Sequence, residues 1–294
     1  MRSIVLAAAV SVLAVSAYAQ PQNPYDPLKT FGPLTLPAPA NSIRTGSGTP
    51  GPAFWQNRAD FSIAASIDTK AHVLSGDETV TYTNNSPEAL GFLWFQMDQN
   101  LYRRDSRGYA MSGGRRVDPR SSTEGYVIDA VTVNGQAVKT VVSDTRMRVD
   151  LPAAVKAGGG QVKVRIQYHF LIPGLFGGRM AWNTNKAGDI YDLAQWYPRM
   201  QVFDDVRGWD TLPYLANEFY LEYGNFDYAV TVPADMIVAG SGALVNPAEV
   251  LTPEQRARFD RAKASDKTVL IRTPEEVAKT PPANGATKTW RFHM

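Results

Sequence analysis

The residue types that hold catalytic zinc are scarce in this chain. Its three histidines, His72, His169 and His293, lie far apart in the sequence, and cysteine is absent. A zinc peptidase helix pairs two histidines four residues apart in the pattern H-E-x-x-H, and no pair here has that spacing. We therefore expect no metal ligands and no cofactor in this chain. His169 alternates with Tyr168 in a strand-like run, which predicts a histidine on the strand surface.

Other catalytic patterns are equally weak. Gly240-Ser241-Gly242 is too short to be the G-x-S-x-G turn that presents a nucleophilic serine, and it lies in a strand-rich region. Asp204 and Asp205 form a carboxylate pair, but adjacent side chains on an extended segment point in opposite directions. We expect these two residues in a turn, or in an ion pair with Arg199 or Arg207. The sequence thus predicts no catalytic residue.

One stretch, YDLAQWYPRM at residues 191–200, combines an amide, aromatic rings, a proline and an arginine. Its amide belongs to Gln195. A buried amide among aromatic rings can orient the polar end of a ligand, or it can join two sheets by hydrogen bonds. The residues alone leave both roles open.

Residues 102–125 carry six arginines among glycines and serines. A patch for an anionic partner is one interpretation. The sequence favours a solvated loop whose arginines pair with nearby carboxylates, because it lacks the interleaved aromatic residues on which nucleic-acid bases stack. A formal net charge of only +2 also argues against nucleic acid as a partner.

The first nineteen residues have the pattern of a secretory signal. Arg2 precedes an apolar run at residues 4–15, and Ala17-Tyr18-Ala19 provides small residues before a predicted cleavage at Gln20. The run is shorter than the roughly 20 residues needed to span a bilayer. We expect residues 1–19 to be a signal peptide, the mature chain to be periplasmic or secreted, and no membrane-spanning segment to follow.

The elements that would position these residues are mostly strands. Residues 20–52 are rich in proline and predict a leader or linker. From residue 53 onward, apolar residues alternate with polar ones, and Asn134-Gly135 predicts a tight hairpin turn. Thr252-Pro253 and Thr273-Pro274 predict the starts of two late helices. The fold class is therefore all-β, a saddle-like sandwich or set of curved sheets with one or two short late helices. The expected strands are 61–67, 80–82, 90–97, 127–133, 147–151, 162–170, 219–222, 228–232, 237–239, 268–271 and a last one near 289–294.

The order of several segments resembles the amino-terminal domain of M1-family zinc metallopeptidases, and more narrowly the exported bacterial aminopeptidase N-like branch. The resemblance extends from Trp55 to the end of the chain. It is carried by FWQNRADF (54–61), YTNNSP (82–87), LWFQMDQN (93–100), residues 195–205, EFYLEYG (218–224), FDYAVTVP (226–233) and VAGSG (238–242).

This resemblance implies a saddle-shaped, non-catalytic β domain, here residues 53–294, that supports a thermolysin-like catalytic domain and borders the site of the peptide's free amine. Gln195 is the residue that it places next to that amine. The catalytic domain would act in cis or in trans and would hold the zinc, because neither its zinc helix nor its glycine-rich motif occurs here. The sequence leaves open a fragment, a truncated gene or a domain that acts alone.

A different class of function also fits the residues. The chain could be a stand-alone exported β-sandwich module that binds peptide or glycan. In that case Trp182, Trp196 and Trp209 would form an aromatic platform for the ligand.

Overall fold

A computed structural model describes residues 40–111, 119–174, 179–186 and 188–294. The predicted signal peptide and residues 20–39 of the predicted leader lie outside the described residues. The chain divides into two compact units, Met1–Phe54 and Trp55–Met294. In the first unit, the Asn41 side chain accepts hydrogen bonds from the backbone N–H groups of Ile43 and Arg44, which closes a turn.

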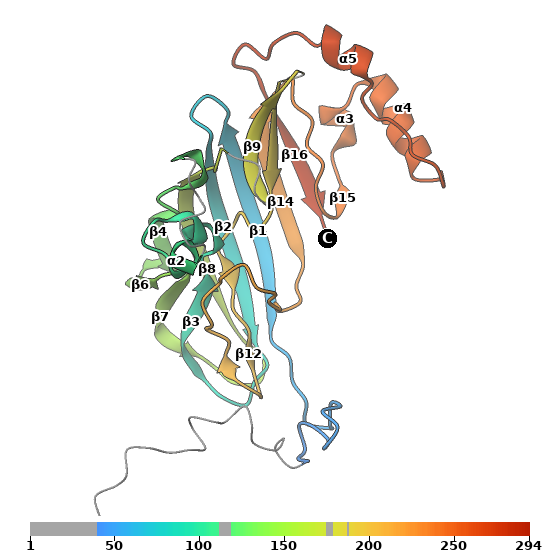
Figure 1. Ribbon diagram of the computed structural model, residues 1–294. Coiled ribbons are helices and arrows are strands. Elements are labelled where there is room, and N and C mark those ends of the chain that lie inside the picture. Colours follow the sequence, from blue (N-terminus) through green and yellow to red (C-terminus); the bar gives the residue numbers. More distant parts are fainter. Residues whose placement is uncertain (1–39, 112–118, 175–178, 187) are drawn as a thin grey trace, which may run out of the picture. The chain divides into compact units, whose positions relative to one another are not determined.

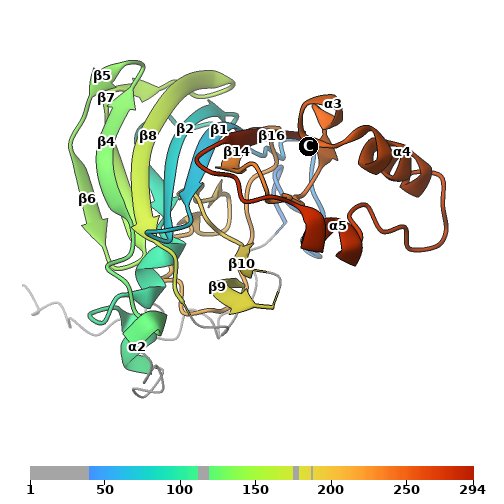
Figure 2. The same cartoon turned by 90° about the horizontal axis from the view of Figure 1, so that it is seen from above.

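The second unit contains a long curved sheet (Figures 1 and 2). Its strand order is β15-β16-β14-β1-β2-β8-β4-β5. The β1–β14 pair is parallel, and its neighbours in the sheet are antiparallel. The bounds are β1 (Arg58–Asp68), β2 (Val73–Asn84), β4 (Val127–Val133), β5 (Gln136–Ala137), β8 (Gly160–Leu171), β14 (Phe226–Pro233), β15 (Ala243–Leu244) and β16 (Thr287–His293).

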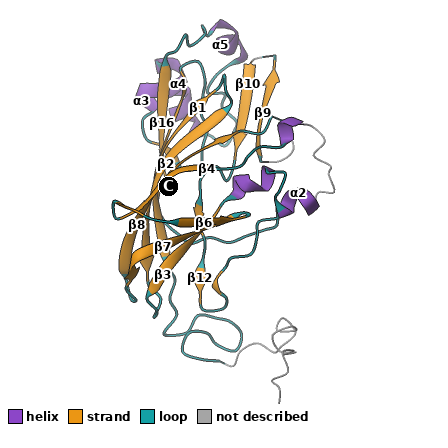
Figure 3. Cartoon of the chain, turned by 90° about the vertical axis from the view of Figure 1, so that its left-hand side faces the viewer, coloured by secondary structure: helices purple, strands orange, loops and turns teal. Residues whose placement is uncertain are grey.

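A second sheet has the order β11-β3-β7-β6. Two small hairpins, β9 with β10 and β12 with β13, complete the strands of the described residues. Figure 3 shows several strands in this unit and only short helices. The bounds are β3 (Leu90–Gln96), β6 (Thr140–Ser143), β7 (Arg146–Val155), β9 (Met180–Asn185), β10 (Gly188–Leu193), β11 (Arg199–Met200), β12 (Phe203–Asp204) and β13 (Gly208–Trp209).

Alternation along the strands builds one contiguous core. In β8, Val164, Ile166 and Tyr168 point inward and are almost completely buried, and Leu93 and Phe95 of β3 are buried in the same core. Each such side chain contributes about 1.5–3 kcal/mol by leaving water. The all-β prediction is therefore confirmed. The described helices are short: η2 (Asp98–Tyr102), α2 (Arg107–Met111), η3 (Pro119–Ser121), α3 (Pro247–Val250), α4 (Pro253–Ala262) and α5 (Pro274–Lys279).

The two late helices begin where their capping residues predict. The side chains of Thr252, before α4, and Thr273, before α5, each accept a hydrogen bond from the backbone N–H three residues on. In turn, the backbone N–H of each threonine donates to the side chain of that third residue, Gln255 or Glu276. The turn at Asn134-Gly135 has positive φ at both residues and joins β4 to β5, as predicted. No helix in the described part of the chain is both long and apolar enough to cross a bilayer.

Three predicted strands are wrong. Residues 219–222, 237–239 and 268–271 are irregular. β14 is paired with β1 on one side and with β16 on the other, so β14 itself offers no edge to a further strand. In residues 268–271 the carbonyl of Ile271 accepts instead from the Arg258 side chain, at 3.0 Å. Short apolar segments therefore predicted strands where the chain forms loops, and of their residues Val238 and Ile271 pack against the core.

Two further expectations need correction. Residues 102–125 are not simply a loop, because the described part contains α2 and η3. Arg103 and Arg107 do pair with carboxylates, those of Asp105 and Asp144. The mostly apolar run at residues 90–97 predicts a strand that is covered on both faces, but the outer face of β3 is only half-buried at Phe92 and Trp94.

Candidate functional site

Gln195 lies in the segment between β10 and β11, in a left-handed backbone conformation with φ of 57°. This conformation costs a residue with a side chain about 1–2 kcal/mol. Its backbone carbonyl accepts hydrogen bonds from Gln99 Nε2 at 2.9 Å and from the Tyr126 hydroxyl at 3.3 Å. Contacts from two distant parts of the chain therefore hold the strained residue in place.

The side chain of Gln195 is also oriented. The Tyr214 hydroxyl donates to its Oε1 at 3.2 Å, and the residue is half-buried. An amide oxygen has two lone pairs, so Oε1 can accept from one more donor, and the NH₂ group can still donate. Gln195 can thus present both a donor and an acceptor to a ligand.

A buried ion pair lies next to this segment. The guanidinium of Arg199 donates to both carboxylate oxygens of Asp98, at 2.6 and 2.7 Å, and both side chains are almost completely buried. The ring of Phe219 covers the guanidinium at 3.7 Å. Burial raises the pKa of Asp98, although the hydrogen bonds and charge of Arg199 oppose this shift. The pair fixes β11 and η2 relative to each other.

The same polar cluster continues to two amides. Gln201 Nε2 donates to Gln96 Oε1 at 2.8 Å, and the Gln96 side chain hydrogen-bonds with Asp98. Gln96 and Gln201 border a cavity of about 330 Å³ under residues 212–221. Its lining includes Gln96, Arg199, Gln201, Val202, Arg207, Asp210, Leu212, Pro213, Tyr214, Asn217, Glu218, Phe219, Tyr220 and Leu221. Tyr214 links this cavity to Gln195.

The three tryptophans of the platform hypothesis belong to different aromatic clusters. Trp182 stacks on His72 with 3.5 Å between ring centroids. Trp196 contacts Tyr197 and Tyr228. Trp209 packs with Phe203, Tyr82 and Phe92. Within the part of the chain that the structure describes, no two of these indoles share a ring contact.

The histidines and the aspartate pair take structural positions. His169 is on the strand surface, as predicted, with its Nδ1 2.9 Å from an Asp129 oxygen. Asp204 caps a turn by accepting from the N–H groups of Val206 and Arg207, and it also accepts from the Tyr220 hydroxyl. In the described ranges, no group of three or more His, Cys, Asp or Glu residues is arranged to hold a metal ion.

Two buried glutamates were missed by the sequence analysis. Glu78 of β2 is fully buried, and neither carboxyl oxygen has a hydrogen-bond partner among the described residues, so burial raises its pKa well above the ordinary value. Burial likewise raises the pKa of Glu222 to about 8, although its carboxyl accepts from the Phe203 backbone. The sequence does contain an indication that Glu78 is buried, because it alternates in register with the inward-facing Val80 and Tyr82 of the same strand.

Comparisons with known proteins give structural neighbours only. No family model matches the chain, and no curated protein matches it. Among solved structures, it is similar to an M1 zinc metallopeptidase from Deinococcus radiodurans, with a TM-score of 0.38 and 17% identity, covering 81% of this chain and 39% of the other. A glutamate-to-alanine mutant from the same organism, bound to a Tyr-Ser-Ala substrate, has a TM-score of 0.40 and 16% identity. This match covers 81% of this chain and 39% of the other.

A further neighbour is a two-domain M1 zinc metallopeptidase mutant bound to L-tryptophan, with a TM-score of 0.38, 16% identity, and 83% and 41% of the two chains covered. The chain therefore spans about two fifths of the length of these structures. They are M1 zinc metallopeptidases with which this chain has low sequence identity.

Proposed function

We propose that residues 53–294 form the non-catalytic β domain of an exported M1-type zinc metallo-aminopeptidase. In this proposal the domain supports the peptidase domain, in cis or in trans, and borders the site that holds the free amine of a peptide. The zinc belongs to that peptidase domain. Two lines support the proposal: the ordered motifs between Trp55 and Gly242, and the geometry of Gln195.

The fixed position of Gln195 is the observation that carries the proposal. A substrate ammonium is a donor and needs an acceptor, which the second lone pair of Gln195 Oε1 provides. The backbone bonds from Gln99 and Tyr126 hold the residue before any ligand arrives. A preorganised group loses less conformational entropy on binding than a mobile one, and this favours affinity. Tyr214 sets the direction of the amide.

Nuclear magnetic resonance of the ¹⁵N-labelled chain tests this role. We expect the side-chain amide signal of Gln195 to shift with L-alaninamide, which has a free amine, and to shift less with N-acetyl-L-alaninamide, which has none. Gln195→Ala assigns the signal, and Gln136→Ala, an exposed glutamine in β5, is the matched control. Equal shifts with both compounds, or no shift with either, would contradict the proposed contact with the amine.

A further inference from the structure

The floor of the cavity under residues 212–221 contains a buried acceptor without a partner. Gln201 is 5% exposed, and its Nε2 donates to Gln96. Its Oε1 has no hydrogen-bond partner among the described residues. A buried acceptor that has lost its water without gaining a partner is unfavourable. The Gln201 side chain lines the cavity, and because its Oε1 has almost no accessible surface, a donor that enters the cavity reaches it after a movement of the lining.

Apart from the exposed Glu218, the charged side chains that line the cavity are in ion pairs. Arg199 is paired with Asp98 and covered by Phe219, and Arg207 lies 3.4 Å from Asp210. A charged ligand would therefore compete with pairs that already exist. The rest of the lining is mainly amide, aromatic and aliphatic. These side chains suit an uncharged ligand with one apolar part.

The side-chain amide of Gln201 has unused hydrogen-bonding capacity. Its Nε2 donates one hydrogen to Gln96 and has a second one, and its Oε1 has no partner among the described residues. A trans peptide amide points its N–H and C=O in opposite directions, so one such amide uses only one of these two groups. A volume of about 330 Å³ is within the usual size of small-ligand pockets, which begin near 300 Å³.

We propose that this cavity binds an uncharged amide of a peptide, with its N–H on Gln201 Oε1 and an aromatic or branched side chain against Tyr214 and Phe219. The site is separate from the contact that Gln195 makes in the proposed function. The two are neighbours, because the ring of Tyr214 lines the cavity while its hydroxyl donates to Gln195.

N-acetyl-L-phenylalaninamide is the probe, and the side-chain amide signals of Gln96 and Gln201 are the readout. We expect saturable shifts in the unmodified chain. Leu212→Trp fills the cavity from an exposed position and should weaken binding about tenfold or more, which corresponds to about 1.4 kcal/mol. Val206→Trp, at a similarly exposed position outside the lining, should leave binding unchanged.

Unfolding curves check that both tryptophan variants are folded. Three results would overturn the proposal: no saturable shift, a shift that persists in Leu212→Trp, or an equal shift with a disaccharide of N-acetylglucosamine. If the contact of Gln195 with amines fails its own test while the probe still binds, only the proposed function is refuted.

Discussion

Removal of one partner from the buried Asp98–Arg199 pair should cost far more stability than removal of an exposed pair. In Arg199→Met the carboxyl of Asp98 keeps its buried position but loses two charge-assisted hydrogen bonds. Loss of one partner of a buried pair typically costs about 3–5 kcal/mol. The Phe219 ring, which now covers the guanidinium, also loses its cation–π contact. We expect a loss within this range at pH 7.

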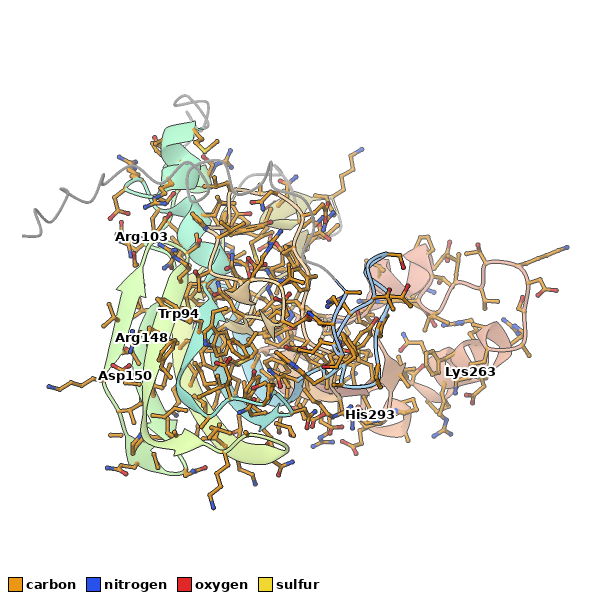
Figure 4. The ribbon with its side chains drawn as sticks, turned by 90° about the horizontal axis from the view of Figure 1, so that it is seen from below. Trp94, Arg103, Arg148, Asp150, Lys263 and His293 are labelled. Atoms are coloured by element: carbon orange, nitrogen blue, oxygen red, sulfur yellow. The ribbon has the colours of Figure 1, made fainter. Side chains whose placement is uncertain are left out.

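Arg148→Met is the matched control. Arg148 pairs with Asp150 on β7 and covers the ring of Phe92 at 4.1 Å, so it repeats the chemistry of Arg199 at the surface. Figure 4 shows Arg148 and Asp150 on the same sheet as Trp94. The Arg148 and Asp150 side chains are 41% and 55% exposed, and exposed pairs contribute about 0–1 kcal/mol. The two variants should therefore differ by about 2 kcal/mol or more.

The loss in Arg199→Met should also depend on pH. Without Arg199, burial keeps raising the pKa of Asp98, and the opposing contribution is gone. A carboxyl whose pKa is higher in the folded state destabilises the fold above its unfolded pKa of about 3.9. The cost is therefore smallest near pH 4 and grows toward pH 7. Urea unfolding at both pH values measures it. An equal loss at pH 4 and pH 7, or a loss no larger than in Arg148→Met, would refute the reasoning.

The remaining predictions concern three other features. Glu222→Gln should become more stable relative to the unmodified chain as pH rises from about 4.5 toward 8, by at most about 1.4 kcal/mol per pH unit. The reason is that burial raises the pKa of Glu222 in the folded chain, so ionisation of this carboxyl destabilises the fold. A difference in melting temperature between the two chains that is the same at pH 4 and pH 8 would contradict this. Asn246→Ala should cost about 2 kcal/mol in urea unfolding, because its side chain bonds both Thr289 O and Arg291 N–H; a loss below 0.5 kcal/mol, roughly that of a surface substitution, would count against it. Mass spectrometry of exported material should find a mature start at Gln20, and retention of Met1 would disprove the signal peptide.

The sequence predicted elements whose cause is local. The alternation in β8 and the two capping boxes depend on residues within a few positions of one another. The predicted bounds of β8 and the predicted starts of α4 and α5 are therefore close to those observed. Residues 219–222 are rich in aromatic and apolar residues, which favour strands, yet they are irregular in the structure. Strand formation there depends on distant neighbours, which a single sequence does not reveal.

The candidate site divides in the same way. Gln195 was identified by its residue type and aromatic surroundings, but its left-handed backbone and its bond to Tyr214 depend on segments far away in the sequence. Gln201 was not identified at all, because nothing near it in the sequence marks its side chain as buried and unpaired. Periodicity indicates which face a residue is on. It does not indicate which hydrogen bonds that face leaves unmade.

The parallel pairing of β1 with β14 has a consequence for the order of folding. Phe61 of β1 lies beside Phe226 of β14, so this contact closes a very long loop. Loop-closure entropy must be lost before such a pair gains its hydrogen bonds, whereas β1 and β2 form a hairpin with a short connection. During synthesis, one edge of β1 therefore stays unpaired until residues 226–233 have emerged. We expect the strands from β1 to β8 to assemble first, and β14, β15 and β16 to dock onto them as the late, rate-limiting step.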